Sequence, residues 1–201
     1  MKKHRTIWLF VLAVIVTPVA VYGVVQWLEG QFSPLPYLGP DNHVIGDFKF
    51  VDQRNKIISL ADWKGKIIVA HFFFTHCPAV CPKMIGQLKR VQAYANQDIA
   101  IYSLSVDPEN DSVGQLRKYA NRSGINHNWY LLTGDKKTLY RFARKDLMIV
   151  ATDGDGGPED FIHSDNVVLI DQQQRIRGYY KGTDEQEMNL LIHDIDKLKA
   201  P

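Results

Sequence analysis

Apolar and polar positions follow one another in segments whose length and period predict strands and helices in turn. Residues 66–74 (KIIVAHFFF) are almost continuously apolar and rich in β-branched and aromatic side chains, as in a central strand buried on both faces. Residues 82–96 instead carry apolar side chains at helical spacing, with Met84, Leu88 and Val91 on one stripe. The pattern therefore predicts a buried strand that leads into a helix.

The rest of the chain continues this alternation. A polar turn at 52–55 lies between apolar segments and predicts a hairpin, and residues 99–106 read as a second buried strand. We expect further helices and strands at 112–121 (helix), 129–132 (strand), 136–145 (helix), 167–171 and 175–180 (a hairpin), and 185–198 (helix). Strands alternating with helices, with a hairpin near the end, indicate an α/β or α+β sandwich with a mixed sheet. The Gly- and Asp-rich segment 152–165 reads as a long loop, and loops of that length are often functional.

The N-terminus has the pattern of a membrane anchor. Residues 7–28 contain no charged side chain, and as a helix they would span roughly 33 Å, enough for a hydrocarbon core of about 30 Å. Lys2, Lys3 and Arg5 precede this run, so the positive-inside rule keeps the N-terminus in the cytoplasm and places the rest on the far side. A cleaved signal peptide is the alternative, and both interpretations export the remainder of the chain. Because no Arg- and Ser-rich presequence precedes the run, we expect a single-pass bacterial inner-membrane protein that faces the periplasm.

Composition supports one exported domain behind this anchor. We expect an anchor at 1–30, a Pro-rich tether at 31–43 and a folded domain at 44–201. Apolar residues make up 45% of the chain, which excludes a disordered or low-complexity protein. The net charge of +2 comes from the N-terminal segment, and the rest is neutral. A neutral domain without a basic stripe has no electrostatic footprint for nucleic acid.

The candidate chemistry lies in the two cysteines, Cys77 and Cys81, which follow the buried strand and precede the helix. A helix N-terminus lowers thiol pKa, and thiolates can bind a soft metal or exchange with disulfides. A purely stabilising disulfide would close a very small loop and constrain the unfolded chain little. The spacing is Cys-x-x-x-Cys rather than the Cys-x-x-Cys of common redox enzymes, and no proline directly precedes the strand at 167–171. A general thiol–disulfide oxidoreductase is therefore disfavoured.

The motif T-x-C-P-x-x-C-P at 75–82 resembles the signature of the Sco/SenC family of copper-delivering assembly factors. The resemblance covers most of residues 44–198. It includes L-x-x-W-x-G-K at 60–66, S-V-D-P-x-x-D at 105–111 and the late His163. The family commonly has an acid where this chain has Ala79, which puts metal affinity or partner recognition, but not the ligand positions, in question.

The resemblance implies a thioredoxin-like fold, with a mixed sheet flanked by helices, behind a single N-terminal transmembrane helix. It also implies a copper site formed by Cys77, Cys81 and His163. Two sulfurs and an imidazole suit copper, and three ligands leave a position open for transfer. The implied partners are cytochrome c oxidase subunit II, whose dicopper centre would receive the metal, and an upstream copper donor or thiol reductant. A thiol–disulfide reductase for the client's cysteines and a redox sensor are the alternatives.

The remaining polar candidates have simpler interpretations. His71 lies in the apolar run and is expected to be a hydrogen-bonded core residue. His76 could tune the thiols or bind metal in place of His163. Asp107 and Asp111 could order their loop, which the family pattern places near the site. Three further histidines are expected on the solvated surface: His43, His127 and His193.

Overall fold

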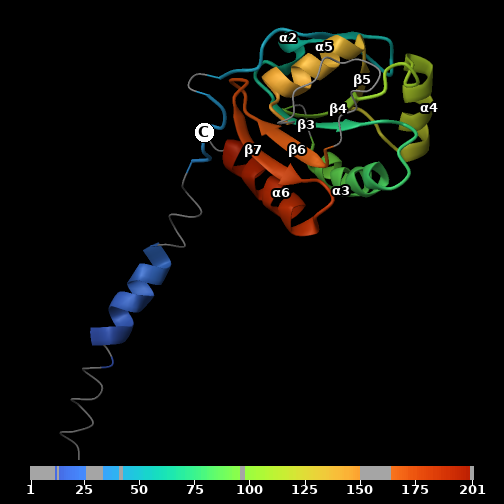
Figure 1. Cartoon of the computed structure of the whole chain (residues 1–201). Helices are drawn as coiled ribbons and strands as arrows, with labels where there is room; N and C mark the ends of the chain where they lie inside the picture. Colours follow the sequence, from blue (N-terminus) through green and yellow to red (C-terminus); the bar gives the residue numbers. More distant parts are fainter. Residues whose placement is uncertain are drawn as a thin grey trace, which may run out of the picture. The chain divides into compact units, whose positions relative to one another are not determined.

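The computed structural model describes residues 12, 14–25, 34–40, 43–95, 98–149 and 164–199. The chain divides into two compact units, Met1–Pro34 and Leu35–Pro201 (Figure 1). In the first unit, residues 14–25 are helical, and the apolar side chains described there are exposed. Among the helices within the described residues, none combines the length and the apolar character needed to cross a membrane. The run predicted as an anchor, 7–28, extends at both ends outside these residues.

The second unit is built around a mixed seven-stranded sheet with the order β2-β1-β5-β4-β3-β6-β7. Its strands are β1 (Lys49–Asp52), β2 (Ile57–Ser59), β3 (Ile67–Phe73), β4 (Ile99–Ser105), β5 (Trp129–Thr133), β6 (Asn166–Ile170) and β7 (Ile176–Lys181). β4 pairs in parallel with both β3 and β5, and all the other neighbours are antiparallel. The predicted mixed sheet and both predicted hairpins are confirmed.

Helices cover both faces of this sheet (Figure 1). They are α2 (Leu60–Trp63), α3 (Val80–Tyr94), α4 (Val113–Ser123), α5 (Lys136–Arg141), the π-helical turn η1 (Phe142–Asp146) and α6 (Glu185–Lys199). Residues of α3, α4 and α6 form one hydrophobic core with the sheet, and residues of α2, α5 and η1 form the other. The helix predicted at 136–145 therefore exists, but it widens into a π-helical turn in its second half.

The central strand β3 explains why the sequence shows an unbroken apolar run. All seven of its residues are buried, because helices pack on both sides of it. Successive side chains point to opposite faces, so Ala70 and Phe72 join the core under α2 and η1, whereas Val69 and Phe73 join the core under α3. The C-terminal end of β3 is thus held from both sides, and this end carries the cysteine segment.

The segment before β1 packs against the sheet. Leu38 forms an isolated antiparallel bridge with Ile176 of β7, and its N–H donates to the Ile176 carbonyl oxygen at 2.9 Å. The compact unit begins at Leu35, ahead of residue 44, where the sequence suggested that the folded domain starts. Part of the segment assigned to the tether, 31–43, is therefore docked on β7, because Leu38 extends the hydrogen bonding of the sheet edge.

Candidate metal and thiol site

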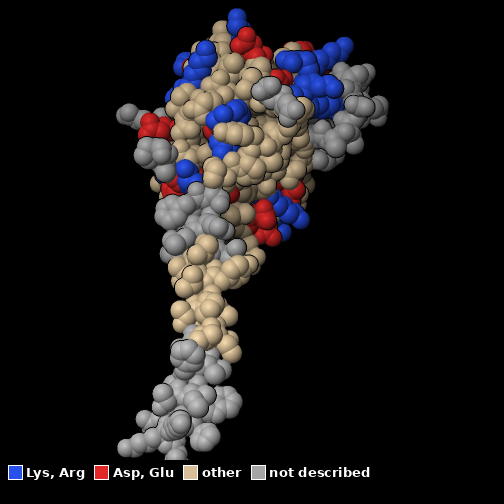
Figure 2. All heavy atoms as spheres, turned by 90° about the vertical axis from the view of Figure 1, so that its left-hand side faces the viewer, with Lys and Arg blue, Asp and Glu red and all other residues tan. Residues whose placement is uncertain are grey.

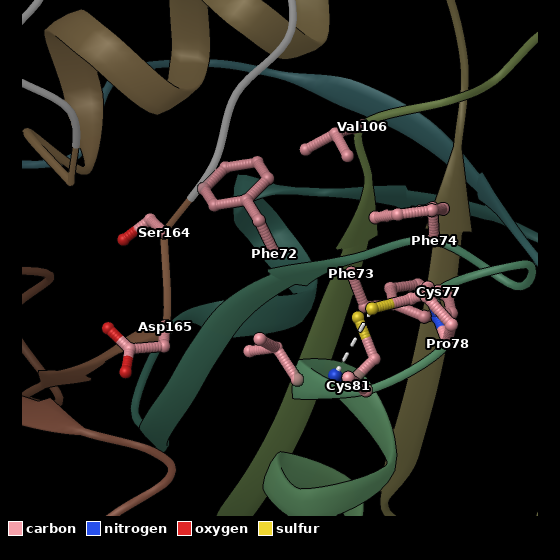
Figure 3. Close-up of a pocket in the computed structure, with 11 residues that line it drawn as sticks. Phe72, Phe73, Phe74, Cys77, Pro78, Cys81, Val106, Ser164 and Asp165 are labelled. Carbon is pink, nitrogen blue, oxygen red and sulfur yellow. Dashed lines mark hydrogen bonds between the residues drawn. The ribbon is translucent and has the colours of Figure 1, made fainter.

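Cys77 and Cys81 lie where the chain leaves β3 and enters α3, as the sequence predicted. The N–H of Cys77 donates to the carbonyl oxygen of Phe74 at 3.2 Å and closes the turn after the strand. The N–H of Cys81, in the first turn of α3, donates to Cys77 Sγ at 3.3 Å. Both thiols are free, and Figure 3 shows the two sulfur atoms next to each other. The fold thus brings together two reduced sulfurs at a helix N-terminus.

The sulfur of Cys77 acts as the cap of α3. The N-cap residue, Ala79, has no side chain that can accept a hydrogen bond, and Pro82 in the first turn has no N–H to offer. The N–H of Cys81 is therefore directed at Cys77 Sγ instead of at a conventional capping oxygen. Because the N-terminus of a helix carries partial positive charge, this position favours a thiolate at Cys77.

The two thiols are shifted in opposite directions. Burial alone would raise the pKa of Cys77, but hydrogen bonds from the Cys81 thiol and from the N–H groups of Cys81, Ala79 and Val80 outweigh it and hold the pKa below its ordinary value. Burial raises the pKa of Cys81 to about 12, and the hydrogen bond with Cys77 and the charge of Asp111 act in the same direction. Cys77 is also half-buried, whereas Cys81 is 5% exposed. Cys77 is therefore the thiol that ionises first and that a partner can reach.

A pocket of about 450 Å³ lies beside the thiols. Apart from the cysteines, its lining is mostly apolar: Phe72, Phe73, Phe74, Pro78, Ala79, Val80 and Val106. Ser164 and Asp165, which lead into β6, complete the lining, and Figure 3 shows them across the pocket from Cys77. A mostly apolar lining limits the water around the sulfurs, which strengthens their interactions with a bound cation.

A buried carboxylate ties the ends of β3 and β4 together beside the cysteine turn. Asp111 is completely buried. It accepts hydrogen bonds from the N–H of Thr75 at 3.2 Å to each oxygen, from Thr75 Oγ1 at 2.5 Å and from Ser105 Oγ at 2.6 Å. Within the loop, Asn110 Nδ2 donates to both carboxylate oxygens of Asp107 at 3.0 Å, and the N–H of Asp111 donates to the carbonyl oxygen of Asp107 at 2.9 Å. The two aspartates therefore order their loop, as predicted.

The hydroxyl partners of Asp111 had no role in the sequence interpretation. Thr75 and Ser105 belong to the two sequence motifs at 75–82 and 105–111, but their spacing does not indicate a shared carboxylate. One signal was present: each is a polar residue at, or just beyond, the C-terminal end of an apolar strand. Because buried polar groups need partners, two such residues on neighbouring parallel strands indicate a common acceptor.

The third predicted ligand, His163, lies outside the described residues. Within the described part of the chain, no group of three or more His, Cys, Asp or Glu side chains is arranged to hold a metal ion. The structure therefore brings two of the three predicted ligands together. The residue that follows His163 in the chain, Ser164, lines the same pocket.

The other histidines near the site differ in environment. His71 is completely buried, with Nδ1 at 3.1 Å from the carbonyl oxygen of Phe72 and Nε2 at 2.5 Å from Ser103 Oγ. The prediction of a hydrogen-bonded core histidine is confirmed. His76 is exposed, with Nδ1 at 3.3 Å from Thr75 Oγ1.

The donor chemistry of this site fits a soft metal. Thiolates select Cu(I) and similar ions over hard cations such as magnesium and calcium. The same two sulfurs can instead lose two electrons and two protons and join as a disulfide, which removes both metal ligands. The arrangement supports metal binding in the reduced state and thiol exchange between the two states.

Comparison with known proteins points to one family. The profile of the SCO1/SenC family matches residues 38–199. The SCO1 protein homolog of Bacillus subtilis is 31% identical over 161 residues, which are 78% of this chain and 83% of that protein. The mitochondrial SCO2 homolog of Bos taurus is 25% identical over 67% of this chain, which spans about half (53%) of that longer protein.

Solved structures agree with these matches. A SCO1/SenC family lipoprotein from Bacillus anthracis has a TM-score of 0.69 and 29% identity, covering 82% of this chain and 99% of that one. BsSco, described as a cytochrome c oxidase assembly protein of the Sco family with a disulfide switch, has a TM-score of 0.65 and 29% identity over 82% and 98% of the two chains. ScoI of Bradyrhizobium japonicum, solved with copper bound, shares the fold at a TM-score of 0.59 and 23% identity over 77% and 99%. The expected thioredoxin-like fold with a mixed sheet flanked by helices is confirmed.

Proposed function

Because this chain belongs to the SCO1/SenC family, we propose that it is a membrane-anchored copper chaperone that delivers copper to the dicopper centre of cytochrome c oxidase subunit II, or primes that centre. One observation carries the proposal: two free sulfurs lie side by side at the N-terminus of a helix, in a mostly apolar pocket. A related protein is described as an oxidase assembly protein, and another was solved with copper bound.

In this proposal Cys77, Cys81 and His163 bind copper as cargo. The two thiolates supply soft ligands, and the imidazole adds a third. Support for including His163 is the place of Ser164, the next residue, in the lining of the pocket. Three protein ligands leave a coordination position open, which a donor needs if the client's ligands are to replace its own.

Copper titration of the reduced full-length chain tests the ligand set. We expect about one copper ion per chain. His163→Ala should weaken binding by more than about a hundredfold, since even supporting residues of metal sites typically cost 10–100-fold. His193→Ala is the matched control, because His193 is exposed on α6.

The outcomes separate the claims. If His163→Ala keeps full copper affinity, the ligand assignment is wrong. If the reduced wild-type chain binds no copper while its thiols are free, the chaperone function is wrong.

A thiol–disulfide reductase is the second candidate, favoured by the unequal exposure of the cysteines. Half-buried Cys77 can attack a client disulfide, and buried Cys81 is placed to resolve the mixed disulfide. The thiolate of Cys77 forms a bond to one client sulfur and releases the other as a thiolate. Cys81 then attacks Cys77 and releases the second client thiolate. The client gains two electrons and two protons, and this chain keeps a Cys77–Cys81 disulfide.

This candidate predicts a different pattern of variants. Cys81→Ser should accumulate a mixed disulfide with an oxidised two-cysteine client peptide, and Cys77→Ser should not. His163→Ala should keep the activity, whereas it should lose copper. The absence of any exchange between the wild-type chain and the oxidised peptide would eliminate a reductase.

The proposed setting is the bacterial inner membrane. Residues 1–30 would form the anchor with the N-terminus in the cytoplasm, 31–43 the tether, and the rest a periplasmic domain. A solved relative is described as a lipoprotein, which supports attachment to a membrane. An upstream copper donor or thiol reductant would load or reduce the cysteines there, and a redox sensor read by a partner is the remaining alternative.

A further inference from the structure

Asp111 is buried in a way that packing of the core does not explain. It lies in the loop between β4 and α4, with no exposed surface. Among the described residues, no Lys, Arg or His side chain forms an ion pair with it. Burying a carboxylate without a cation is costly unless hydrogen bonds replace the lost water. The role of Asp111 in the fold is therefore to accept hydrogen bonds.

Within the described residues, the donors to this carboxylate are Thr75, which lies just beyond the end of β3, and Ser105, the last residue of β4. Thr75 supplies its backbone N–H and its hydroxyl, and Ser105 supplies its hydroxyl. Both hydroxyls also accept bonds, from Gln115 Nε2 at 3.3 Å and from the N–H of Asp107 at 3.0 Å, so each is free to donate its proton to Asp111. The carboxylate thus closes a network of charge-assisted hydrogen bonds between β3 and β4.

This network fixes the start of the cysteine turn. Thr75 directly follows Phe74, and the carbonyl oxygen of Phe74 accepts the N–H of Cys77. Cys77 Sγ in turn accepts the N–H of Cys81. The backbone from Thr75 to Phe74 and these hydrogen bonds thus connect the Asp111 carboxylate to the turn, to Cys77 Sγ and to the backbone N–H of Cys81.

We propose that Asp111 is a positioning residue for the two sulfurs: through Thr75 it holds the turn that presents Cys77 to Cys81. The consequence for copper rests on the proposed function. The consequence for disulfide formation does not, because it depends only on how well the two sulfurs are held together.

The test compares Asp111→Asn with a matched change at a second buried carboxylate. Asp52 is also completely buried and accepts the N–H groups of Arg54 and Lys56 at 2.8 Å, within the β1–β2 turn. β1 is separated from β3 by two strands in the sheet order. Asp52→Asn therefore controls for the loss of a buried charge far from the cysteines.

Two quantities are measured in the full-length chain. The first is the equilibrium constant for the Cys77–Cys81 disulfide against glutathione disulfide, which takes up the two electrons and two protons and becomes two glutathione thiols. We expect Asp111→Asn to lower it about tenfold, because an oriented pair loses effective concentration when its support loosens. The second is copper affinity, which should fall by about 10–100-fold. Asp52→Asn should leave both within about twofold of wild type.

Thr75→Val keeps the test decisive if Asp111→Asn does not fold. It removes one donor hydroxyl but leaves the charge of Asp111 in place, and it should shift the disulfide equilibrium in the same direction. Disulfide equilibria within twofold of wild type in the folded variants, or an equal shift in Asp52→Asn, would overturn the proposal. If the wild-type chain binds no copper, the chaperone function fails, and the glutathione equilibrium still decides the role of Asp111.

Discussion

Ala79 has no side-chain acceptor, so the N–H of Cys81 in the first turn of α3 donates to a sulfur atom. An Asp in the N-cap position normally accepts the N–H of the second or third helical residue. Here the third is Pro82, which has no N–H, and the second is Cys81, whose N–H already donates to Cys77. An acidic side chain at residue 79 would therefore compete with Cys77 for the same donor. The absence of an acid there stabilises the Cys77 thiolate.

Ala79→Asp should raise the pKa of Cys77. The new carboxylate would take the Cys81 N–H and place a negative charge next to the sulfur. The rate of alkylation of Cys77 against pH measures this, in a Cys81→Ser background so that one thiol reports. Ala79→Asn offers the same acceptor without the charge and should raise the pKa less. An unchanged or lowered pKa in Ala79→Asp would show that Cys81 N–H does not control the thiol.

His71 links the core to the pH dependence of stability. Burial lowers its pKa to about 4, although the hydrogen bond to Phe72 acts in the opposite direction. The unfolded chain has the ordinary value of 6.5. Between these values the unfolded chain binds a proton that the folded chain does not. The folded state is therefore fully favoured above pH 6.5 and loses stability as the pH falls toward 4.

We expect this one side chain to remove roughly 2 kcal/mol of unfolding free energy between about pH 7.5 and pH 5. His71→Gln keeps an acceptor for Ser103 but cannot be protonated in this range, so its stability should fall by that much less. Urea unfolding at the two pH values measures the difference. His193→Gln, at an exposed position, should keep the full wild-type dependence. An equal change in unfolding free energy between the two pH values in wild type and His71→Gln would show that His71 is not the titrating group.

At the scale of elements, a buried ion pair of Arg177 in β7 holds residues 35–38 against the sheet. Arg177 is 7% exposed and donates to Asp171 Oδ2 at 2.9 Å, to the carbonyl oxygen of Pro36 at 3.1 Å and to that of Leu35. The ring of Tyr37 lies over the same guanidinium at 4.4 Å. The side chain thus replaces water for one carboxylate and two carbonyl groups at once, which a lysine could not do in this planar geometry.

Arg177→Leu should destabilise the chain by about 2–3 kcal/mol, because Asp171 and two carbonyl groups lose a charged donor. The loss should not be larger, since Arg175 still donates to Asp171. Chemical unfolding measures the change, and cleavage by chymotrypsin after Tyr37 should become faster. Lys118→Leu, on the exposed surface of α4, should change neither. If Arg177→Leu unfolds at the wild-type denaturant concentration, the segment is not held by this pair.

These elements also show what a sequence can and cannot predict. The strand β3 could be predicted because a strand buried on both faces has an almost unbroken run of apolar residues. The helix α3 could be predicted because its buried face carries apolar residues at helical spacing. The docking of Leu38 on β7 was not, because three prolines in the segment (Pro34, Pro36 and Pro40) also fit an extended tether. The cysteine pair was predicted from its place between a buried strand and a helix and from the resemblance of its motif to a known family. The role of Asp111, in contrast, depends on contacts between residues 36 positions apart in the chain.

At the scale of the whole molecule, positive and negative charges are mixed and nearly balanced. Figure 2 shows Lys and Arg side chains scattered among Asp and Glu on the face that it presents. The net charge of +2 arises from the N-terminal segment. A nearly balanced charge gives little long-range attraction to nucleic acid, and the proposed function instead relies on a membrane anchor to set the position of the chain.

The proposed anchor can be tested on the full-length chain in a bacterial cell. The chain should stay in the membrane fraction after carbonate extraction, because a run of 22 uncharged residues suffices to span the bilayer as a helix. A protease added to spheroplasts should digest the cysteine domain, because Lys2, Lys3 and Arg5 retain the N-terminus in the cytoplasm. The mass of the recovered protein separates the anchor from a cleaved signal peptide, since cleavage removes the first 20 or so residues.

Replacing the three basic residues by Glu should reduce the protease-accessible fraction, whereas a neutral replacement of Lys64, far along the chain, should not. A domain that is protected in intact spheroplasts but digested after lysis would place the cysteines in the reducing cytoplasm, where a disulfide between them would not persist. Cys77 and Cys81 would then stay reduced, and formation of their disulfide could not release a bound metal.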